Sequence, residues 1–378
     1  RVGSHDFTSL DVARVAGEKL RACGGRVDLE NPDIEIYVEI RGREAYATTN
    51  SKRVRGVGGV PLGSQSRVLV LFSGGFDSSV ATWLVMRKGS PVDLLYIHMG
   101  SLENIYRVAE VAEKIALEWS LGHRVRFYIA DFSEVIREIR EKIDPRYWQI
   151  ALRRSMYILA SKLVEKNKYS AIVTGESIWE TNSQTIENLY ACSRGLEDLM
   201  IIRPVIGMPK DDIISLSIRI GLYEKSEKVR ETCWMGSYTP LKPDISEFLA
   251  QFSRINREVF DKVANEILEI DLYSNWREEL RKIIDASRDV VIDTIPEKAV
   301  IADLTKRFVG KEYRGHKIID LSEIEEYRDR EIVFVCEEGE LSELFAYNLR
   351  KAGFKTYSLR GGLKSLRMKD LRNKSRDK

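Results

Sequence analysis

The sequence has few of the residues that build metal sites and disulfide frameworks. Its 378 residues include 4 Cys and 4 His, and no two cysteines form a Cys-x-x-Cys pair. This scarcity argues against a dedicated zinc site or a four-cysteine cluster. In a reducing cytosol, two of the thiols could instead serve redox or sulfur chemistry. The four cysteines are Cys23, Cys192, Cys233 and Cys336.

Two further absences limit the class of protein. No apolar run approaches the roughly 18 to 20 residues of a membrane span, and no secretory signal pattern is present, so we expect a cytoplasmic protein with no membrane partner. Lys and Arg number 60 against 58 Asp and Glu, so the net charge gives no argument for nucleic-acid binding. A hydrophobic content of 43% is ample for the cores of two or three domains.

What the sequence does have is a glycine turn between a strand and a helix. The apolar run 68–72 is followed by Ser73-Gly74-Gly75-Phe76-Asp77-Ser78 and then by a helix-like stretch at 79–88. Glycines allow a tight turn with converging N–H groups, and the helix N-terminus adds donors and partial positive charge. The turn has neither the Gly-Lys-Ser/Thr ending of a Walker loop nor the Gly-x-Gly-x-x-Gly dinucleotide pattern. We therefore predict a phosphate site of another kind here.

The order of apolar runs and amphipathic segments predicts an α/β fold. From residue 67 onward, strand-like runs alternate with helix-like segments, which favours a doubly wound, mostly parallel sheet with ligands at the carboxyl ends of its strands. A glycine-rich break at 56–63 separates this part from a small α/β piece before it, and a third, short α/β unit follows. The predicted segments are 1–62, 63–243, a helical connector at 244–288, 289–367 and a basic tail at 368–378.

Other strand ends of the same sheet carry polar groups that could complete a nucleotide site. Thr174-Gly175-Glu176 ends a strand, and Ser183-Gln184-Thr185 follows a short loop; an ordinary capped turn is the alternative. His98 and Met99, at a second strand end, could line a base pocket, although a histidine at a strand end is more often structural. Arg203 and Lys210 could neutralise phosphate charge. The alternative is that both are solvated cations on the surface. These strand-end and cationic candidates are His98, Met99, Arg203 and Lys210.

Cys336 lies where a persulfide could be held. The strand-like run 332–335 ends at this cysteine, and a helix-like segment begins at residue 343. A thiolate at such a turn meets backbone N–H donors and the positive end of a helix, so it can carry sulfur as a persulfide anion. Cys233, in the polar segment 231–234, is a second candidate thiol. For both cysteines the alternative is a small buried hydrophobic residue.

Together these motifs resemble a known family. The loop at 73–78 resembles the pyrophosphate loop of the ATP pyrophosphatases. The order of the motifs, from this loop through Thr174-Gly175-Glu176 and Ser183-Gln184-Thr185 to Arg203-Pro204 and Glu231-Thr232-Cys233, resembles the tRNA 4-thiouridine sulfurtransferases of the thiamine-biosynthesis sulfurtransferase family. Residues 1–55 resemble the later part of a THUMP RNA-binding domain. The segments 336–342 and 358–362 resemble a rhodanese active-site loop, with the departure that the first carries three glutamates and no basic residue.

The resemblance implies how ATP would be used. The central sheet would be adenine-nucleotide α-hydrolase-like, with ATP at Ser73 to Ser78 and Mg²⁺ near Asp77. ATP would adenylate O4 of a tRNA uridine, expected at position 8, because a carbonyl oxygen leaves poorly until it is converted to a phosphate. Sulfur would then displace AMP and leave 4-thiouridine. The remaining nucleotide-binding candidates under this resemblance are His98, Met99, Thr174, Gly175, Gln184 and Arg203.

The resemblance also implies a route for sulfur. Cys336 would receive sulfane sulfur from a cysteine desulfurase and present it to the adenylated uridine, and Cys233 would attack to release it, leaving a Cys233–Cys336 disulfide. An iron–sulfur route with three cysteines is disfavoured, because the ATP-binding segment holds only Cys192 and Cys233. Cys23 and Cys192 are then structural. Family precedent makes a homodimer reasonable.

Three alternatives stay open. Another pyrophosphate-loop enzyme that adenylates and thiolates tRNA would share the loop but would need neither Cys336 nor a THUMP-like start. A persulfide relay would pass sulfur to a carrier protein of thiamine thiazole synthesis and would tolerate loss of Asp77. A catalytically silent RNA-binding module would neither bind ATP nor form a persulfide.

Overall fold

The computed structural model describes residues 5–52, 56–230 and 238–366, and the chain divides into two compact units, Arg1–Gly58 and Gly59–Lys378. The first unit contains helix α1 (Ser9–Ala22) and the antiparallel hairpin of β1 (Ile36–Arg41) and β2 (Glu44–Thr49). Thr8 and Asp11 close a capping box at the start of α1, so the chain's own side chains satisfy the first free N–H groups of the helix. The predicted order of helix, strand and returning strand is confirmed.

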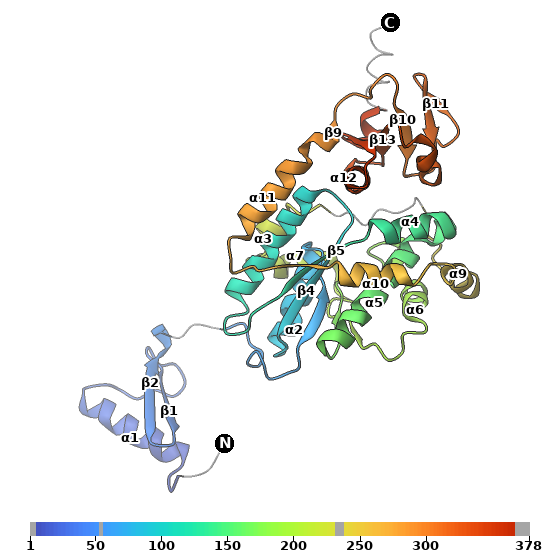
Figure 1. Cartoon of the computed structure of the whole chain (residues 1–378). Coiled ribbons are helices and arrows are strands. Elements are labelled where there is room, and N and C mark those ends of the chain that lie inside the picture. The colour runs from blue at the N-terminus through green and yellow to red at the C-terminus, as the bar shows by residue number, and fades with distance from the viewer. Residues whose placement is uncertain (1–4, 53–55, 231–237, 367–378) are drawn as a thin grey trace, which may run out of the picture. The chain divides into compact units, whose positions relative to one another are not determined.

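The second unit is built on a six-stranded sheet in the order β7-β6-β3-β4-β5-β8, which Figure 1 shows near its centre. Every neighbouring pair is parallel except β5 and β8. All seven residues of β4 are buried, as expected for a parallel strand covered on both faces. The strands are β3 (Val68–Leu71), β4 (Val92–His98), β5 (Phe127–Asp131), β6 (Ile172–Val173), β7 (Ile201–Ile202) and β8 (Leu268–Ile270).

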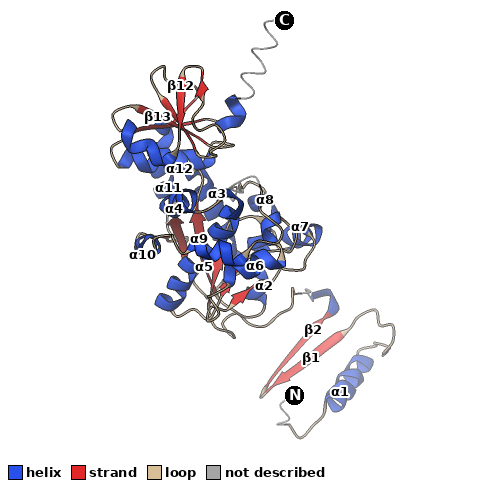
Figure 2. Ribbon diagram, turned by 90° about the vertical axis from the view of Figure 1, so that its right-hand side faces the viewer, coloured by secondary structure: helices blue, strands red, loops and turns tan. Residues whose placement is uncertain are grey.

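Helices cover both faces of this sheet (Figure 2). Successive strand residues point to opposite faces, so Val70 and Leu94 join one apolar cluster while Leu69 and Leu95 join the other. Helices of the first face are α2 (Phe76–Arg87), α3 (Leu102–Glu118), α7 (Lys210–Arg219), α8 (Tyr223–Ser226) and α11 (Trp276–Ser287). Helices of the second are α4 (Ser133–Lys142), α5 (Trp148–Asn167), α6 (Ile186–Ser193), α9 (Ile245–Phe252) and α10 (Glu258–Asn265). The predicted doubly wound, mostly parallel architecture is confirmed.

The stretch predicted as a helical connector differs in one respect. Residues 244–288 do contain α9, α10 and α11, but residues 268–270 form β8, an edge strand antiparallel to β5. Only Ile270 of these three residues is buried. A strand with one buried position has no apolar alternation, so its sequence gave no strand signal.

A second six-stranded sheet occupies the C-terminal part, in the order β11-β12-β10-β13-β14-β9. Cys336 follows its central strand β13, and helix α12 begins four residues later. The apolar cluster under α4 and α5 continues through Phe334 and Phe345 into one face of this sheet, so the two sheets share a core. Its elements are β9 (Val291–Ile292), β10 (Val300–Asp303), β11 (Glu312–Tyr313), β12 (His316–Ile319), β13 (Glu331–Val335), α12 (Glu340–Lys351) and β14 (Lys355–Leu359). Among the residues described, no helix has both the length and the apolar character to cross a bilayer.

Candidate active site

The glycine turn at 73–78 lies where the connections of the sheet change direction. After β3 the chain continues to β4 and β5 on one side, while β6 and β7 lie on the other. The carboxyl ends of β3 and β6 are therefore neighbours whose following loops diverge, which is the position where open α/β sheets bind ligands. The structure places Ser73 to Ser78 and Thr174-Gly175 together at this point.

The loop is held by its own hydroxyl groups. Ser78 Oγ lies 3.0 Å from Ser73 Oγ and accepts from the Ser73 N–H at 3.2 Å. The Gly75 N–H donates to Ser73 Oγ at 3.3 Å, and Ser79 Oγ donates to the Gly74 carbonyl at 3.3 Å. Helix α2 begins at Phe76 with Gly75 as its N-cap, and no side chain caps it. The first turn of α2 thus leaves N–H donors for an anionic group.

Gly175 brings the second strand end into backbone contact with this loop. A Cβ at position 175 would lie 2.5 Å from Ser78 N and 2.7 Å from Asp77 C. No residue with a side chain fits at such distances, because real Cβ atoms do not approach backbone this closely. The glycine therefore permits the two loops to line one site.

Asp77 projects from the first turn of α2 into an ion-paired group. Lys210, at the start of α7, lies 2.7 Å and 3.0 Å from the two carboxylate oxygens of Asp77. The same ammonium group lies 3.1 Å from Glu180 Oε1. One lysine therefore holds two carboxylates together beside the glycine turn, and the electrostatic attraction of these carboxylates raises the pKa of Lys210 although burial opposes it. The sequence identified Asp77 and Lys210, but it gave no reason to select Glu180.

Arg203 belongs to a buried cluster around Glu176. Arg203 Nε donates to Glu176 Oε2 at 2.7 Å, and Arg153 Nε lies 2.8 Å from the other oxygen. Tyr157 and Thr174 donate hydroxyl groups to the same carboxylate. Burial alone would raise the pKa of Glu176, but the charges of the two arginines outweigh it and hold the pKa below its usual value. The sequence-predicted Arg203 and Thr174 thus position the loop after β6 through Glu176.

His98 and Met99 lie at the carboxyl end of β4 and are buried. His98 is 3% exposed, and neither ring nitrogen has a hydrogen-bond partner among the residues described. Burial lowers the pKa of His98 to about 4, although the charges of Asp131 and Glu340 oppose this shift. The ring is therefore neutral at pH 7.

The predicted segment Ser183-Gln184-Thr185 is used mainly to shape a loop. Gln184 Oε1 accepts from the Ser177 N–H at 2.8 Å, which closes the loop after Glu176. Thr185 caps α6 by accepting from the Asn188 N–H, and its own hydroxyl donates to the Leu241 carbonyl at 2.8 Å. These contacts place Gln184 near the second loop and occupy the hydroxyl of Thr185.

Cys336 lies at the carboxyl end of the C-terminal sheet, in a turn rich in hydrogen bonds. Its Sγ accepts from the Gly339 N–H at 3.2 Å and lies 3.6 Å from Ser342 Oγ, while its carbonyl accepts from the Leu363 N–H at 2.8 Å. A Cβ at Gly362 would lie 2.1 Å from that carbonyl, so only glycine allows residues 361–363 to close over the turn. The residue is buried, with 6% of its surface exposed.

The three glutamates of this turn do not face the thiol as uncompensated charges. Glu337 pairs with Arg307 at 2.8 Å, Glu338 pairs with Lys364, and Glu340 pairs with Arg230. By its sequence the turn carries three glutamates and no basic residue, an arrangement that would oppose a thiolate. Cations from other segments correct that interpretation, because each glutamate has a basic partner.

The remaining cysteines have different surroundings. Cys192 is buried in α6, its thiol donates weakly to the Ile150 carbonyl, and burial raises its pKa to about 12. A thiol in this state is an inert core residue, as the sequence suggested. Cys23 is exposed at the end of α1. Cys233, the second catalytic candidate, lies outside the described residues.

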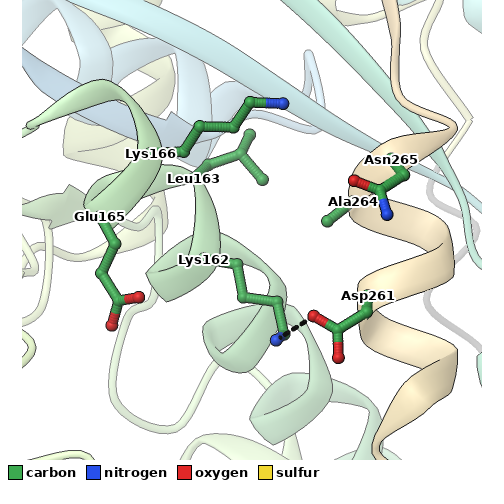
Figure 3. A pocket seen from close by; sticks show the side chains of 7 residues that line it. All are labelled: Lys162, Leu163, Glu165, Lys166, Asp261, Ala264 and Asn265. Carbon is green, nitrogen blue, oxygen red and sulfur yellow. Dashed lines mark hydrogen bonds and ion pairs between the residues drawn. The ribbon is translucent and has the colours of Figure 1, made fainter.

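A shallow hollow on the second face is a different feature. It lies between α5 and α10, and Figure 3 shows the ion pair of Lys162 and Asp261 spanning it at 2.5 Å. The last turn of α5 leads to the start of β6, so this hollow lies toward the amino edge of the sheet, away from the loops that follow the strands. The side chains around it are Lys162, Leu163, Glu165, Lys166, Asp261, Ala264 and Asn265.

Known protein families match both compact units of this chain. The family model "Thiamine biosynthesis protein (ThiI)" matches residues 63–259, and the THUMP domain model matches residues 1–50. A tRNA sulfurtransferase of Desulfurococcus amylolyticus is 42% identical over 371 residues, which cover 96% of this chain and 75% of the relative. One of Pyrobaculum aerophilum is 38% identical over 368 residues, covering 95% of this chain and 75% of that relative.

A solved structure agrees with these sequence matches. It is described as a 4-thiouridine synthetase in complex with RNA and bound ATP, and it is similar to this chain with a TM-score of 0.58 and 26% identity over 71% of this chain and 72% of its own. The similar fold and the identity over nearly the whole chain agree with the resemblance that the motifs suggested. The chain belongs to the thiamine biosynthesis protein (ThiI) family and carries a THUMP domain match at its start.

Proposed function

We propose that this chain is an ATP-dependent tRNA sulfurtransferase that converts a uridine of tRNA, expected at position 8, to 4-thiouridine. The observation that carries the proposal is the glycine turn at the switch point of the sheet, with Gly175 in backbone contact with it. Relatives named tRNA sulfurtransferase and a similar structure that holds RNA and ATP support the substrates. The THUMP match supports RNA as the partner of the first unit.

In the proposed reaction the loop residues hold ATP while the uridine oxygen attacks its α-phosphate. The N–H groups at the start of α2 would bind the β- and γ-phosphates. Lys210, now paired with Asp77, would pair in part with the phosphates once they are bound. His98 and Met99, at the next strand end, would border the adenine base with a neutral ring. Pyrophosphate then leaves, and the uridine carries AMP at O4.

Magnesium ions fit the carboxylates beside this loop. Asp77 and Glu180 offer oxygen donors, the ligand type that Mg²⁺ takes, and a single ammonium group now bridges them. Asp77 and Glu180 would hold the ion together with phosphate oxygens. When bound, it would neutralise charge that develops on the leaving pyrophosphate.

Sulfur would come from a persulfide on Cys336. A cysteine desulfurase is the proposed donor. The outer sulfur of the persulfide would displace AMP from C4 of the uridine and remain bonded to Cys336 Sγ. The Cys233 thiolate would then attack Cys336 Sγ, breaking its bond to the transferred sulfur, which leaves as 4-thiouridine while a Cys233–Cys336 disulfide forms. A homodimer is the assembly that we expect. Relay of sulfur to a thiamine-pathway carrier protein is the second candidate function, and it would use Cys336 without the ATP site.

The test is thiolation of unmodified tRNA with ATP, Mg²⁺, a cysteine desulfurase and labelled cysteine, read as near-ultraviolet absorbance of 4-thiouridine. Asp77→Ala, Cys233→Ser and Cys336→Ser should each abolish product. Asp211→Ala, an exposed aspartate of α7, and Cys23→Ser, an exposed cysteine, are the matched controls and should keep it. A parent protein that accumulates labelled persulfide but forms no thiouridine would favour the relay function instead.

A further inference from the structure

Within the part of the chain that the structure describes, one buried cation near Cys336 has no ion-pair partner. Arg140, in the last turn of α4, is 4% exposed, and its Nε and Nη2 atoms have no hydrogen-bond partner among the residues described. Its guanidinium lies over the ring of Trp148, 4.5 Å from the ring centre. Burying an arginine without an anion is costly, since the charge loses its hydration and gains no partner in return.

The C-terminal sheet packs directly against this arginine. Lys306, in the turn after β10, donates from Nζ to the Arg140 carbonyl at 2.9 Å. The apolar neighbours of Arg140 on α4 and α5, Ile139 and Trp148, belong to the same cluster as Cys336. Arg140 therefore belongs to helix α4, which covers the first six-stranded sheet. It nevertheless lies at the carboxyl edge of the C-terminal sheet, where Cys336 is held.

Burial lowers the pKa of Arg140 to about 10, and among the residues described the charges of Asp303, Asp320 and the thiolate form of Cys336 partly offset this effect. Asp303 is already bonded to Thr305 and to the Phe308 N–H, and Asp320 to Ser322 and Lys306. Of the three, the sulfur site alone gains a new anion during sulfur transfer.

We propose that Arg140 receives the outer sulfur of a Cys336 persulfide, so that residues of both sheets form one site for a sulfane-sulfur anion. The inference rests on the proposed role of Cys336 as persulfide carrier. Gly339 N–H stabilises the inner sulfur and the guanidinium of Arg140 the outer one. Arg140 acts here as a positioning residue that retains the anion until an acceptor takes the sulfur.

The loading reaction balances with an inorganic donor. The Cys336 thiolate attacks the outer sulfur of thiosulfate, a sulfur–sulfur bond forms at Sγ, the bond to the sulfonate sulfur breaks, and sulfite leaves with its electron pair. The product is a persulfide anion, and no external oxidant or reductant is needed. Cyanide can remove the same sulfur as thiocyanate and restore the thiolate.

The experiment measures retention of labelled sulfur by the full chain without ATP or tRNA. Protein is loaded from thiosulfate labelled in its outer sulfur and freed of donor, and the half-life of label on the Cys336 peptide is followed by mass spectrometry. Arg140→Met should shorten the half-life about tenfold, the loss expected when an opposite charge near an anion is removed. Arg140→Lys, which keeps the charge, should stay within about threefold of the parent.

Controls separate this role from a structural one. Arg137→Met changes an exposed arginine of the same helix and should retain label as the parent does. The thermal midpoint of Arg140→Met should equal or exceed that of the parent, because methionine removes an uncompensated buried charge and keeps similar bulk. A structural arginine would show the opposite, a lower midpoint with unchanged retention.

Three results would overturn the inference: equal retention by Arg140→Met and the parent, an equal loss in Arg137→Met, or no label on Cys336 of the parent. A chain that retains the label through Arg140 yet makes no thiouridine supports this inference and contradicts the proposed function. The two can therefore fail separately.

Discussion

Gly175 lies closer to the glycine turn at 73–78 than any side chain would permit, and the consequence can be measured. Gly175→Ala places a methyl group 2.5 Å from Ser78 N, so the loops must separate by several tenths of an ångström. We expect ATP affinity to fall at least tenfold, because the N–H groups at the start of α2 would no longer converge with the second strand end. Equilibrium binding of labelled ATP measures this. Gly207→Ala, where an added Cβ would meet nothing within 4 Å, is the matched control.

Glu176 makes a second prediction at the residue scale. Glu176→Gln leaves Arg153 and Arg203 buried beside a neutral group, so we expect a loss of about 3 kcal/mol in unfolding free energy. Because the folded pKa of Glu176 lies below its usual 4.5, the loss should be complete above pH 4.5 and shrink as pH falls below it. Thermal unfolding at several pH values tests this, with exposed Glu187→Gln as control. A pH-independent difference would contradict the ion-pair account.

Individual residues differed in how readily the sequence identified them. Asp77 and Gly175 were found because strand, turn and helix follow one another within a short stretch, so the local pattern fixes their place. Arg140 and Glu180 were missed. Arg140 looks like one more charge on an amphipathic helix, and only the packing of the C-terminal sheet, more than 160 residues later in the chain, buries it. Periodicity within a helix carries no information about such a partner.

At the scale of elements, the N-termini of α12 and α3 meet. Glu340 at the start of α12 accepts from the Ser101 N–H, which precedes α3, at 3.1 Å. One turn further on, Glu343 is partly buried, and burial together with the charge of Glu340 raises its pKa to about 7. Two helix ends with free N–H groups thus share carboxylates, which joins the C-terminal sheet to the end of β4.

This contact predicts a pH-dependent stability. Because its folded pKa is raised, Glu343 stabilises the fold fully below its usual value of 4.5, and the contribution is lost as pH rises through 7. Glu343→Gln, neutral at every pH, should match the parent near pH 4.5 and exceed it at pH 8 by roughly 1 kcal/mol, about 2 °C in thermal midpoint. Exposed Glu326→Gln should show no such trend. A Glu343→Gln variant less stable than the parent at pH 8 would refute this account.

Elements with a strong pattern were predictable and those without it were not. Helices such as α4 and α7 have apolar faces, and they belong to the alternation of strand-like and helix-like segments that the sequence showed. Strand β8 was missed because only one of its residues is buried, and its neighbour β5 supplies the reason for its conformation. Tertiary pairing, which no local rule detects, decided that segment.

At the scale of the molecule, polar contacts join the two sheets of the second unit. Asn348 of α12 donates to Asp131 Oδ2 at 2.7 Å and to Ser133 Oγ at 3.0 Å, at the junction of β5 and α4. Together with Lys306 and Glu340, this residue keeps the C-terminal sheet and α12 against the elements that surround the first sheet. The sequence predicted both sheets, but it could not predict their docking, because the contacts are single polar residues scattered along the chain.

Loosening this docking should expose Cys336. Asn348→Ala removes two hydrogen bonds, each worth about 1 kcal/mol, so we expect Cys336 to react several-fold faster with an alkylating agent at constant pH. Mass spectrometry of the Cys336 peptide gives the rate. Asn265→Ala, an exposed asparagine at the end of α10, should react like the parent. Equal rates for all three proteins would mean that docking does not shield the thiol.

The enclosure of Cys336 has a consequence for timing. Persulfides that are exposed to solvent react with oxidants and with nucleophiles other than the intended acceptor. A persulfide on Cys336, as proposed, would be sheltered from both hazards in the turn that Gly339 and Gly362 close. Under that proposal the protein could be loaded with sulfur long before it meets its RNA, so that supply of sulfur and arrival of substrate would become independent events.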